Sequence, residues 1–245
     1  DARDADRGGE HESAPEVDRP VKLIVANEKA LARGVRYVEE DLNRAFPGAP
    51  DAYTYEGRLA HELLNEIRGC DVLSLHSTQS YPKPFALVDE LDGHDRAVCQ
   101  NLSVEALVET ADYSGGRLIA YPGVIEIECG LQRSTDAAEN AKALVREFLA
   151  AVGALSRGTT LRDHPLSVFR LDTQIPKPDA KGYEVFVENF ERVAEGDQFA
   201  AADGDPLVAE FPFYPVLLSA NGYRNVFGYA GSLVGRLDGE GSGRS

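Results

Sequence analysis

Short apolar runs and longer amphipathic stretches follow one another through the first 156 residues. Apolar or alternating runs predict strands at residues 21–26, 72–75, 85–88 and 124–128. Apolar residues spaced three and four apart predict helices over residues 56–68, 95–107 and 137–152. Strands that alternate with helices indicate an α/β fold, in which helices flank a mixed, mostly parallel sheet.

The pattern changes after residue 156. Prolines interrupt any long helical stretch, and short apolar segments recur at residues 167–171, 183–187, 207–209 and 214–218. This pattern is typical of a small β-rich domain. We therefore expect two domains, residues 1–156 and residues 157–245, and the second, smaller domain should cover the functional site of the first.

Composition narrows the classes of partner. The chain has 41 acidic and 25 basic residues, a net charge of -16, so we expect neither nucleic acid nor an anionic membrane as partner. A chain with this excess of acidic residues is either a protein adapted to high salt or an ordinary acidic protein. No apolar run is long enough to cross a bilayer. Three widely spaced cysteines suit the reducing cytoplasm. The oligomeric state stays open, homo-oligomers included.

A polar loop at residues 36–48 concentrates planar hydrogen-bond donors. Arg36, Asp41, Asn43 and Arg44 stand within nine residues of one another. A guanidinium offers a rigid fork of donors to a carboxylate, and it can also polarise a carbonyl. The alternative is a solvated loop with an internal Asp–Arg pair.

Two ionisable side chains stand where predicted strands end. His76 ends one strand and Glu128 ends another, on the same face of its strand as Glu126. Ligands bind at the carboxyl ends of strands in open α/β sheets, so His76 is a candidate metal ligand or base and Glu128 a candidate base. Either residue could instead have a structural role, as a hydrogen-bonded histidine or a solvent-facing carboxylate.

Several short motifs occur in a characteristic order. They are Asp41-Leu42-Asn43-Arg44, Leu75-His76-Ser77 and Glu126-x-Glu128-x-Gly130. In this order and spacing the chain, from about residue 21 to its end, resembles the succinylglutamate desuccinylase/aspartoacylase family, a branch of the zinc-carboxypeptidase-like hydrolases. The resemblance implies a zinc-carboxypeptidase-like sheet followed by a β-rich domain.

The same resemblance implies an activity. Members of the family are zinc-dependent amidohydrolases, so the substrate would be a small acidic N-acyl amino acid and the cofactor one Zn²⁺ per chain. His76 would be a zinc ligand, Glu128 the general base, and Arg36 the group that polarises the scissile carbonyl.

The resemblance also assigns residues to substrate binding. Asn43 and Arg44 would bind one substrate carboxylate, Arg117 a second, and Tyr223 would reach a carboxylate from the C-terminal domain. Asp41 would orient the arginines.

One motif of the family is missing. A His-Gly-x-Glu loop should supply two zinc ligands, but only Gly8-Gly9-Glu10-His11 resembles the approach to it, which makes His11 the candidate for a further ligand. Nine residues, two of them prolines, separate His11 from Val21, too few for the expected helix. The chain also has no methionine, so we expect a further N-terminal segment. The alternative is a truncated site with one good ligand, and a single imidazole cannot hold a catalytic zinc ion.

Ser74 is a smaller departure, since the family usually has an acidic residue two positions before the histidine. Two other functions remain open at this point. One is a metal-free carboxylate-binding protein on the same scaffold, and the other is a carboxypeptidase.

Overall fold

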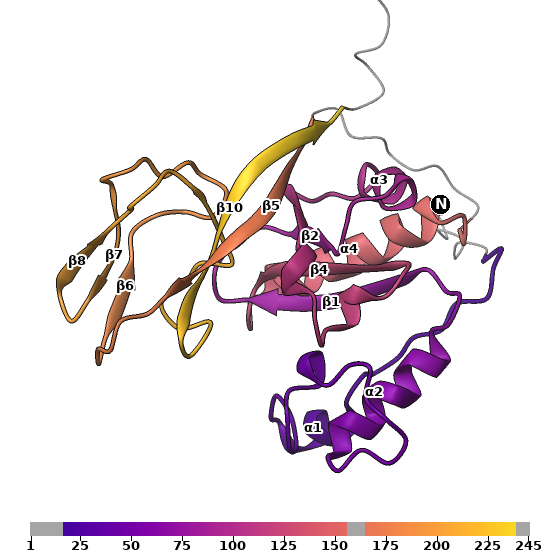
Figure 1. Ribbon diagram of the computed structural model, residues 1–245. Helices are drawn as coiled ribbons and strands as arrows, with labels where there is room; N and C mark the ends of the chain where they lie inside the picture. The colour runs from indigo at the N-terminus through magenta and orange to yellow at the C-terminus, as the bar shows by residue number, and fades with distance from the viewer. Residues whose placement is uncertain (1–16, 156–164, 239–245) are drawn as a thin grey trace, which may run out of the picture.

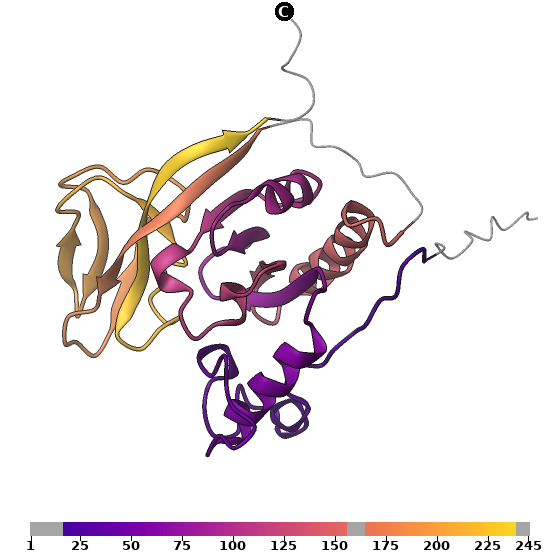
Figure 2. The same ribbon diagram turned by 45° about the vertical axis from the view of Figure 1, so that its right-hand side comes forward.

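A seven-stranded mixed sheet forms the centre of the computed structural model, which describes residues 17–155 and 165–238 (Figures 1 and 2). Its strand order is β1 (Val72–Thr78), β4 (Val124–Leu131), β2 (Phe85–Val88), β3 (Ala106–Glu109), β5 (Leu166–Pro176), β10 (Val226–Leu237) and β9 (Tyr214–Val216). From β1 to β5, only the β4–β2 pairing is antiparallel. The predicted α/β class with a mixed, mostly parallel sheet is confirmed.

Helix α4 (Thr135–Ala151) packs on the β1–β4 side of this sheet. It begins where predicted because the Ser134 hydroxyl accepts a hydrogen bond from the Ala137 N–H, a common N-cap. Its apolar face places Leu144 and Phe148 in a core with Ile125 and Ile127 of β4. The buried strand β4 is thus fixed in place beside β1.

The N-terminal lobe lies next to β1 and carries the polar loop (Figure 2). It contains α1 (Glu28–Arg33), the 3₁₀ turn η1 (Leu42–Arg44) and α2 (Tyr55–Glu66). Phe46, Ala60 and Leu63 form its small core. The lobe therefore holds the loop against the edge of the sheet.

Two predicted elements are wrong. Residues 21–26 form no strand, and Leu23 is 87% exposed, because no strand pairs with this segment in the described part of the chain. The helix predicted over 95–107 ends early: α3 spans Gly93–Cys99, and residues 106 and 107 begin β3. Buried strands and buried helices share the same apolar content, which explains the second error.

The C-terminal part adds a three-stranded antiparallel sheet of β6 (Tyr183–Val185), β7 (Gln198–Ala202) and β8 (Asp205–Val208). The long strands β5 and β10 run from the central sheet toward it (Figure 1). Phe227 and Ala230 of β10 pack with Phe199 and Ala200 of β7, which joins the two sheets in one core. The division of the chain after residue 156 stays a prediction.

Short 3₁₀ turns complete the described fold: η2 (Ala111–Tyr113) and η3 (Leu118–Ala120). No helix in the described ranges combines the length and the apolar content that a membrane crossing requires.

Candidate functional site

His76 and the two carboxylates of β4 share one face of the sheet. In the parallel pairing of β1 and β4, His76 stands opposite Glu128, and Ser74 stands opposite Glu126. Because side chains two residues apart point to the same side of a strand, all four side chains lie on that face. The strand-end placement predicted from the sequence thus brings His76 and Glu128 together.

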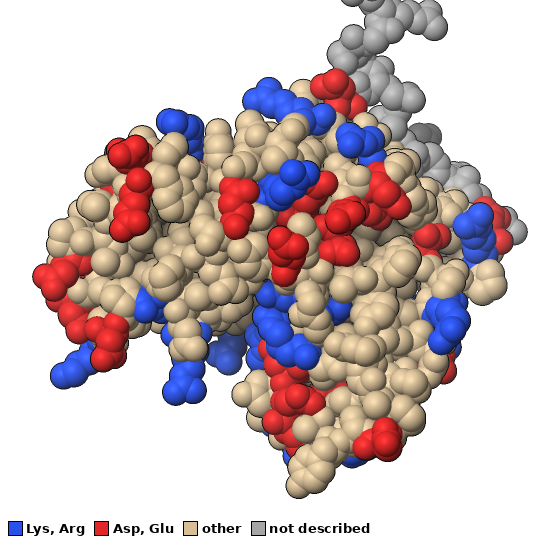
Figure 3. Space-filling model, viewed as in Figure 1, with Lys and Arg blue, Asp and Glu red and all other residues tan. Residues whose placement is uncertain are grey.

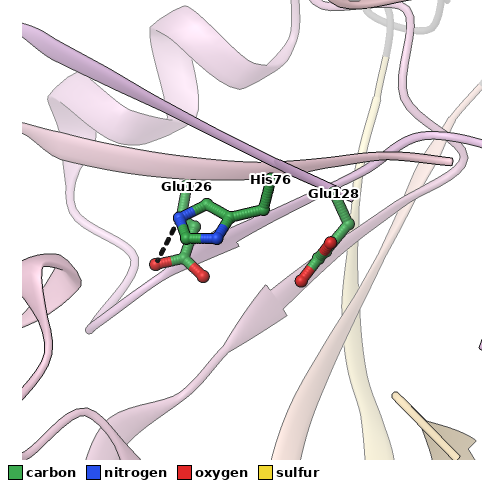
Figure 4. A group of neighbouring side chains, drawn as sticks. All are labelled: His76, Glu126 and Glu128. Atoms are coloured by element: carbon green, nitrogen blue, oxygen red, sulfur yellow. Dashed lines mark ion pairs between the residues drawn. The ribbon is translucent and has the colours of Figure 1, made fainter. Parts of the chain in front are cut away.

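Figure 4 shows the imidazole of His76 between the carboxylates of Glu126 and Glu128. The Nε2 atom of His76 lies 3.6 Å from Glu126 Oε2 and 2.9 Å from the Ser74 hydroxyl. One donor atom from each of His76, Glu126 and Glu128 lies within 4.8 Å of the others. Both glutamates are buried.

Burial changes the chemistry of Glu128. Loss of hydration raises the pKa of its carboxyl to about 7; Glu126 adds to the rise, while His76 and Arg36 oppose it. Glu128 Oε2 is buried and has no hydrogen-bond partner in the described ranges. A buried acceptor without a partner is costly, so this atom is available to a water, a ligand or a cation.

The donor set fits a divalent metal ion. An imidazole nitrogen and carboxylate oxygens are ligands that zinc accepts, and they also suit other first-row divalent metals. The unpaired oxygen of Glu128 and the close approach of Glu126 to His76 are what such an ion would compensate. The described residues therefore form a possible His/Glu/Glu metal site.

The polar loop and His76 line one open cleft of about 650 Å³, to which the loop contributes Arg36 and Asn43. Arg36 donates to Asp41 Oδ2 from Nε at 3.2 Å and from Nη2 at 2.9 Å. Asp41 Oδ1 accepts from the Asn43 N–H and thereby caps η1. Asp41 therefore holds Arg36 and caps η1, while the expectation that it orients Arg44 as well stays a prediction.

Asn43 links the loop to the sheet. Its Nδ2 donates a long hydrogen bond of 3.5 Å to Glu126 Oε2, and its Oδ1 accepts from the Leu118 N–H at 3.1 Å. This amide is thus already engaged with the protein on both sides. Its predicted contact with a substrate carboxylate stays a prediction.

Arginines and tyrosines from three parts of the chain gather beside the cluster. Arg117 Nη2 donates to the Tyr229 hydroxyl at 2.8 Å, and the rings of Tyr223 and Tyr229 meet edge to face. Loss of hydration lowers the pKa of Arg44, and the charge of Arg117 lowers it further. Burial raises the pKa of Tyr223, which also senses the charge of Glu128.

The structure thus brings together all the predicted site residues that it describes. His11 is outside the described residues. Arg44, Arg117 and Tyr223 form a neighbouring patch, close enough to Glu128 for its charge to act on Tyr223.

Sequence reasoning did not assign three residues of this region. Glu126 had a visible signal, because it alternates with Glu128 on one strand. Tyr229, the partner of Arg117, had none, since no element was predicted after residue 218. Glu56 was hidden inside a helix, yet its buried carboxylate accepts hydrogen bonds from the N–H groups of Val38 and Glu39.

A protein-family model matches more than half of the sequence. The family model for the succinylglutamate desuccinylase/aspartoacylase catalytic domain matches residues 12–152. No curated protein matches the chain.

Solved structures share the fold at low sequence identity. Murine aminoacylase 3 superposes with a TM-score of 0.67 and 19% identity over 88% of this chain and 84% of its own. The succinylglutamate desuccinylase/aspartoacylase from Rhodobacter sphaeroides superposes with a TM-score of 0.66 and 16% identity over 87% of this chain and 73% of its own. The product-bound ectoine utilization protein EutE from Ruegeria pomeroyi superposes with a TM-score of 0.62 and 19% identity over 79% of this chain and 67% of its own. Since the family model covers more than half of the sequence, the chain belongs to the succinylglutamate desuccinylase/aspartoacylase family of hydrolases.

Proposed function

We propose that this protein is a zinc-dependent amidohydrolase that removes an acyl group from a small acidic N-acyl amino acid. The observation that carries the proposal is the buried carboxylate of Glu128, which lacks a hydrogen-bond partner and faces His76. With a pKa of about 7, this group can both accept and return a proton near neutral pH.

His76 would hold zinc through an imidazole nitrogen. Zinc, when bound, supplies Lewis acidity that activates water near neutral pH and polarises a carbonyl. His11 would be a further ligand if the chain before residue 17 reaches this face.

Glu128 would accept a proton from the attacking water and pass it to the nitrogen of the leaving amine. Arg36 would donate to the carbonyl oxygen as negative charge develops there, because hydrogen-bond donors placed at a developing oxyanion lower the barrier. Its pairing with Asp41 holds the guanidinium on the cleft side of the loop.

The neighbouring patch supports an acidic substrate. Arg44 and Arg117 repel each other in the free protein, and partial loss of hydration makes the charge of Arg44 more costly. A carboxylate bound between them would relieve both effects. Tyr223 keeps its proton because burial raises its pKa, so its hydroxyl can donate to the same anion. Asn43 would bind the carboxylate with Arg44.

The test is the isosteric substitution Glu128→Gln. Removal of a general base should lower kcat on N-acetyl-aspartate or N-succinyl-glutamate by at least about 10²-fold, with bound zinc unchanged. Zinc content is measured by native mass spectrometry on the same sample. Undiminished hydrolysis in this variant would sink the assignment of Glu128 as the base.

A second candidate is a metal-free carboxylate-binding protein. It is favoured by one observation: Arg44, Arg117 and Tyr223 gather in one patch, whose side chains need no metal to bind an anion. Wild-type protein that binds N-acyl aspartate, but takes up no zinc and releases no acid, would support it. A carboxypeptidase would instead cleave blocked dipeptides in preference to N-acyl amino acids.

The three free cysteines fit the cytoplasmic location that we propose.

A further inference from the structure

We propose that Glu126 is a metal ligand beside His76, which leaves Glu128 free to act as the base. This inference rests on the metal dependence proposed above. It assigns a role to a residue that the sequence motifs did not single out, and it divides two neighbouring carboxylates between two tasks.

The first argument is the spacing of donor atoms. Zinc lies about 2.0–2.1 Å from a histidine nitrogen and 2.0–2.2 Å from a carboxylate oxygen, so two ligands at the tetrahedral angle stand about 3.4 Å apart. His76 Nε2 and Glu126 Oε2 are 3.6 Å apart. That distance is too long for a charged hydrogen bond, which would close to about 2.7–2.9 Å. The pair is spaced for a shared ion.

The second argument is charge. The Glu126 side chain is 8% exposed, and no Lys or Arg forms an ion pair with it within the described ranges. Its polar neighbours are the imidazole of His76 and the amide of Asn43. A buried carboxylate needs a compensating cation, and a metal ion bound between Glu126 and His76 would provide one.

The third argument separates Glu128 from Glu126. Among the ion pairs of the described residues, His76 pairs with Glu126 and not with Glu128, so Glu128 stays beyond 4.0 Å from the imidazole nitrogens. A Glu128 oxygen is nevertheless within 4.8 Å of a His76 nitrogen, and its Oε2 atom is buried without a partner. One water molecule that hydrogen-bonds to both groups can span such a separation, and a base must lie within one hydrogen bond of the water it activates.

The experiment compares two matched variants, Glu126→Gln and Glu128→Gln. Both replace a buried carboxylate by an isosteric amide on the same face of β4. The Kd for Zn²⁺ is measured by competition with a chromophoric chelator, and the visible spectrum of the Co²⁺-loaded protein reports the coordination. Folding is checked by circular dichroism.

We expect Glu126→Gln to weaken Zn²⁺ binding by at least about tenfold and to alter the Co²⁺ spectrum. Glu128→Gln should change the Kd by less than about threefold. An unchanged Kd in Glu126→Gln would overturn the proposal. An equal loss in both variants would also overturn it, because Glu128 would then be a ligand too.

A second variant serves if Glu126→Gln does not fold. Glu126→Asp shortens the side chain by one methylene and should also weaken Zn²⁺ binding. An unchanged Kd for Zn²⁺ in Glu126→Asp would overturn the proposal. If zinc binding depends on Glu126 but no N-acyl amino acid is hydrolysed, the ligand assignment stands and the proposed activity fails. If hydrolysis depends on Glu128 while Glu126→Gln binds zinc normally, the activity stands and the ligand assignment fails.

Discussion

At the scale of single residues, the surroundings of Glu128 determine its chemistry. Its carboxyl is buried, lies near a second carboxylate and has a pKa of about 7 in the protein without a metal ion. A glutamate in water ionises near pH 4.3. The folded state therefore binds this proton more tightly than the unfolded state does.

This difference predicts a pH dependence of stability in the metal-free protein. A raised folded-state pKa stabilises the protein at low pH, and that contribution is lost as pH rises through the folded value of about 7. Between pH 5 and pH 8, Glu128 should cost about 2 kcal/mol of unfolding free energy.

Urea unfolding of the wild type and of Glu128→Gln at both pH values measures this contribution, with chelator present. The variant should lose less stability than the wild type as pH rises. Parallel pH dependence in the two proteins would show that Glu128 does not titrate in this range.

Sequence reasoning located part of the site at this scale. His76 and Glu128 could be predicted because both end strands, and strand ends converge in such sheets. The contact of Glu126 with His76 could not, because it depends on the register of β1 against β4. Register is set by packing that a single sequence does not show.

At the scale of elements, α2 holds the loop that carries Arg36. The Glu56 side chain is buried in the first turn of α2 and accepts hydrogen bonds from the backbone N–H groups of Val38, Glu39 and Glu40. Asn27, the N-cap of α1, donates to it as well. One carboxylate thus ties α1, the loop and α2 together.

Replacement of Glu56 by Ala should therefore loosen the whole lobe. It would leave several backbone N–H groups without their acceptor, at a cost of about 1–3 kcal/mol for each group that stays buried. Burial opposes ionisation of Glu56, but its hydrogen bonds lower its pKa overall, so its contribution is present at neutral pH and fades in acid.

Chemical denaturation at pH 7 measures the loss, and hydrogen exchange of residues 36–44 shows where it falls. Glu62→Ala, on an exposed site of the same helix, is the matched control and should have little effect. Equal stability of Glu56→Ala and Glu62→Ala would contradict the anchoring role.

The elements themselves were predictable where apolar spacing was regular. Strands β1, β2 and β4 and helices α2 and α4 lie close to their expected positions. The C-terminal strands β7 (Gln198–Ala202) and β10 (Val226–Leu237) were not foreseen, because alanines make up most of β7 and glycines interrupt the apolar pattern of β10. Gly228, at φ +155°, explains one of these glycines: a Cβ there would lie 2.5 Å from the Leu217 carbonyl oxygen.

At the scale of the whole molecule, negative charge dominates. Acidic side chains gather on the face shown in Figure 3, above the N-terminal lobe, and the formal charge of the chain is -16. Like charges on a compact surface repel one another and oppose folding. Salt shortens the range of that repulsion from about 10 Å at 0.1 M to about 3 Å at 1 M.

We therefore expect the melting temperature to rise between 0.1 and 1 M KCl. Differential scanning calorimetry measures the rise, and sucrose at matched osmolality serves as a control for effects other than screening. A melting temperature that is constant or falls over this range would contradict an adaptation to high salt.

The outer edge of β1 has a consequence for handling the protein. β1 ends the strand order of the central sheet, and the apolar side chains of Val21, Leu23 and Val25 are exposed on the segment that precedes α1. An unpaired strand edge and exposed apolar side chains allow other copies of a protein to associate with it, unless like charges keep the copies apart. Near the isoelectric point of about 4.7 the net charge no longer keeps copies of the protein apart. We therefore expect the protein to associate through these exposed residues and to precipitate from acid solution.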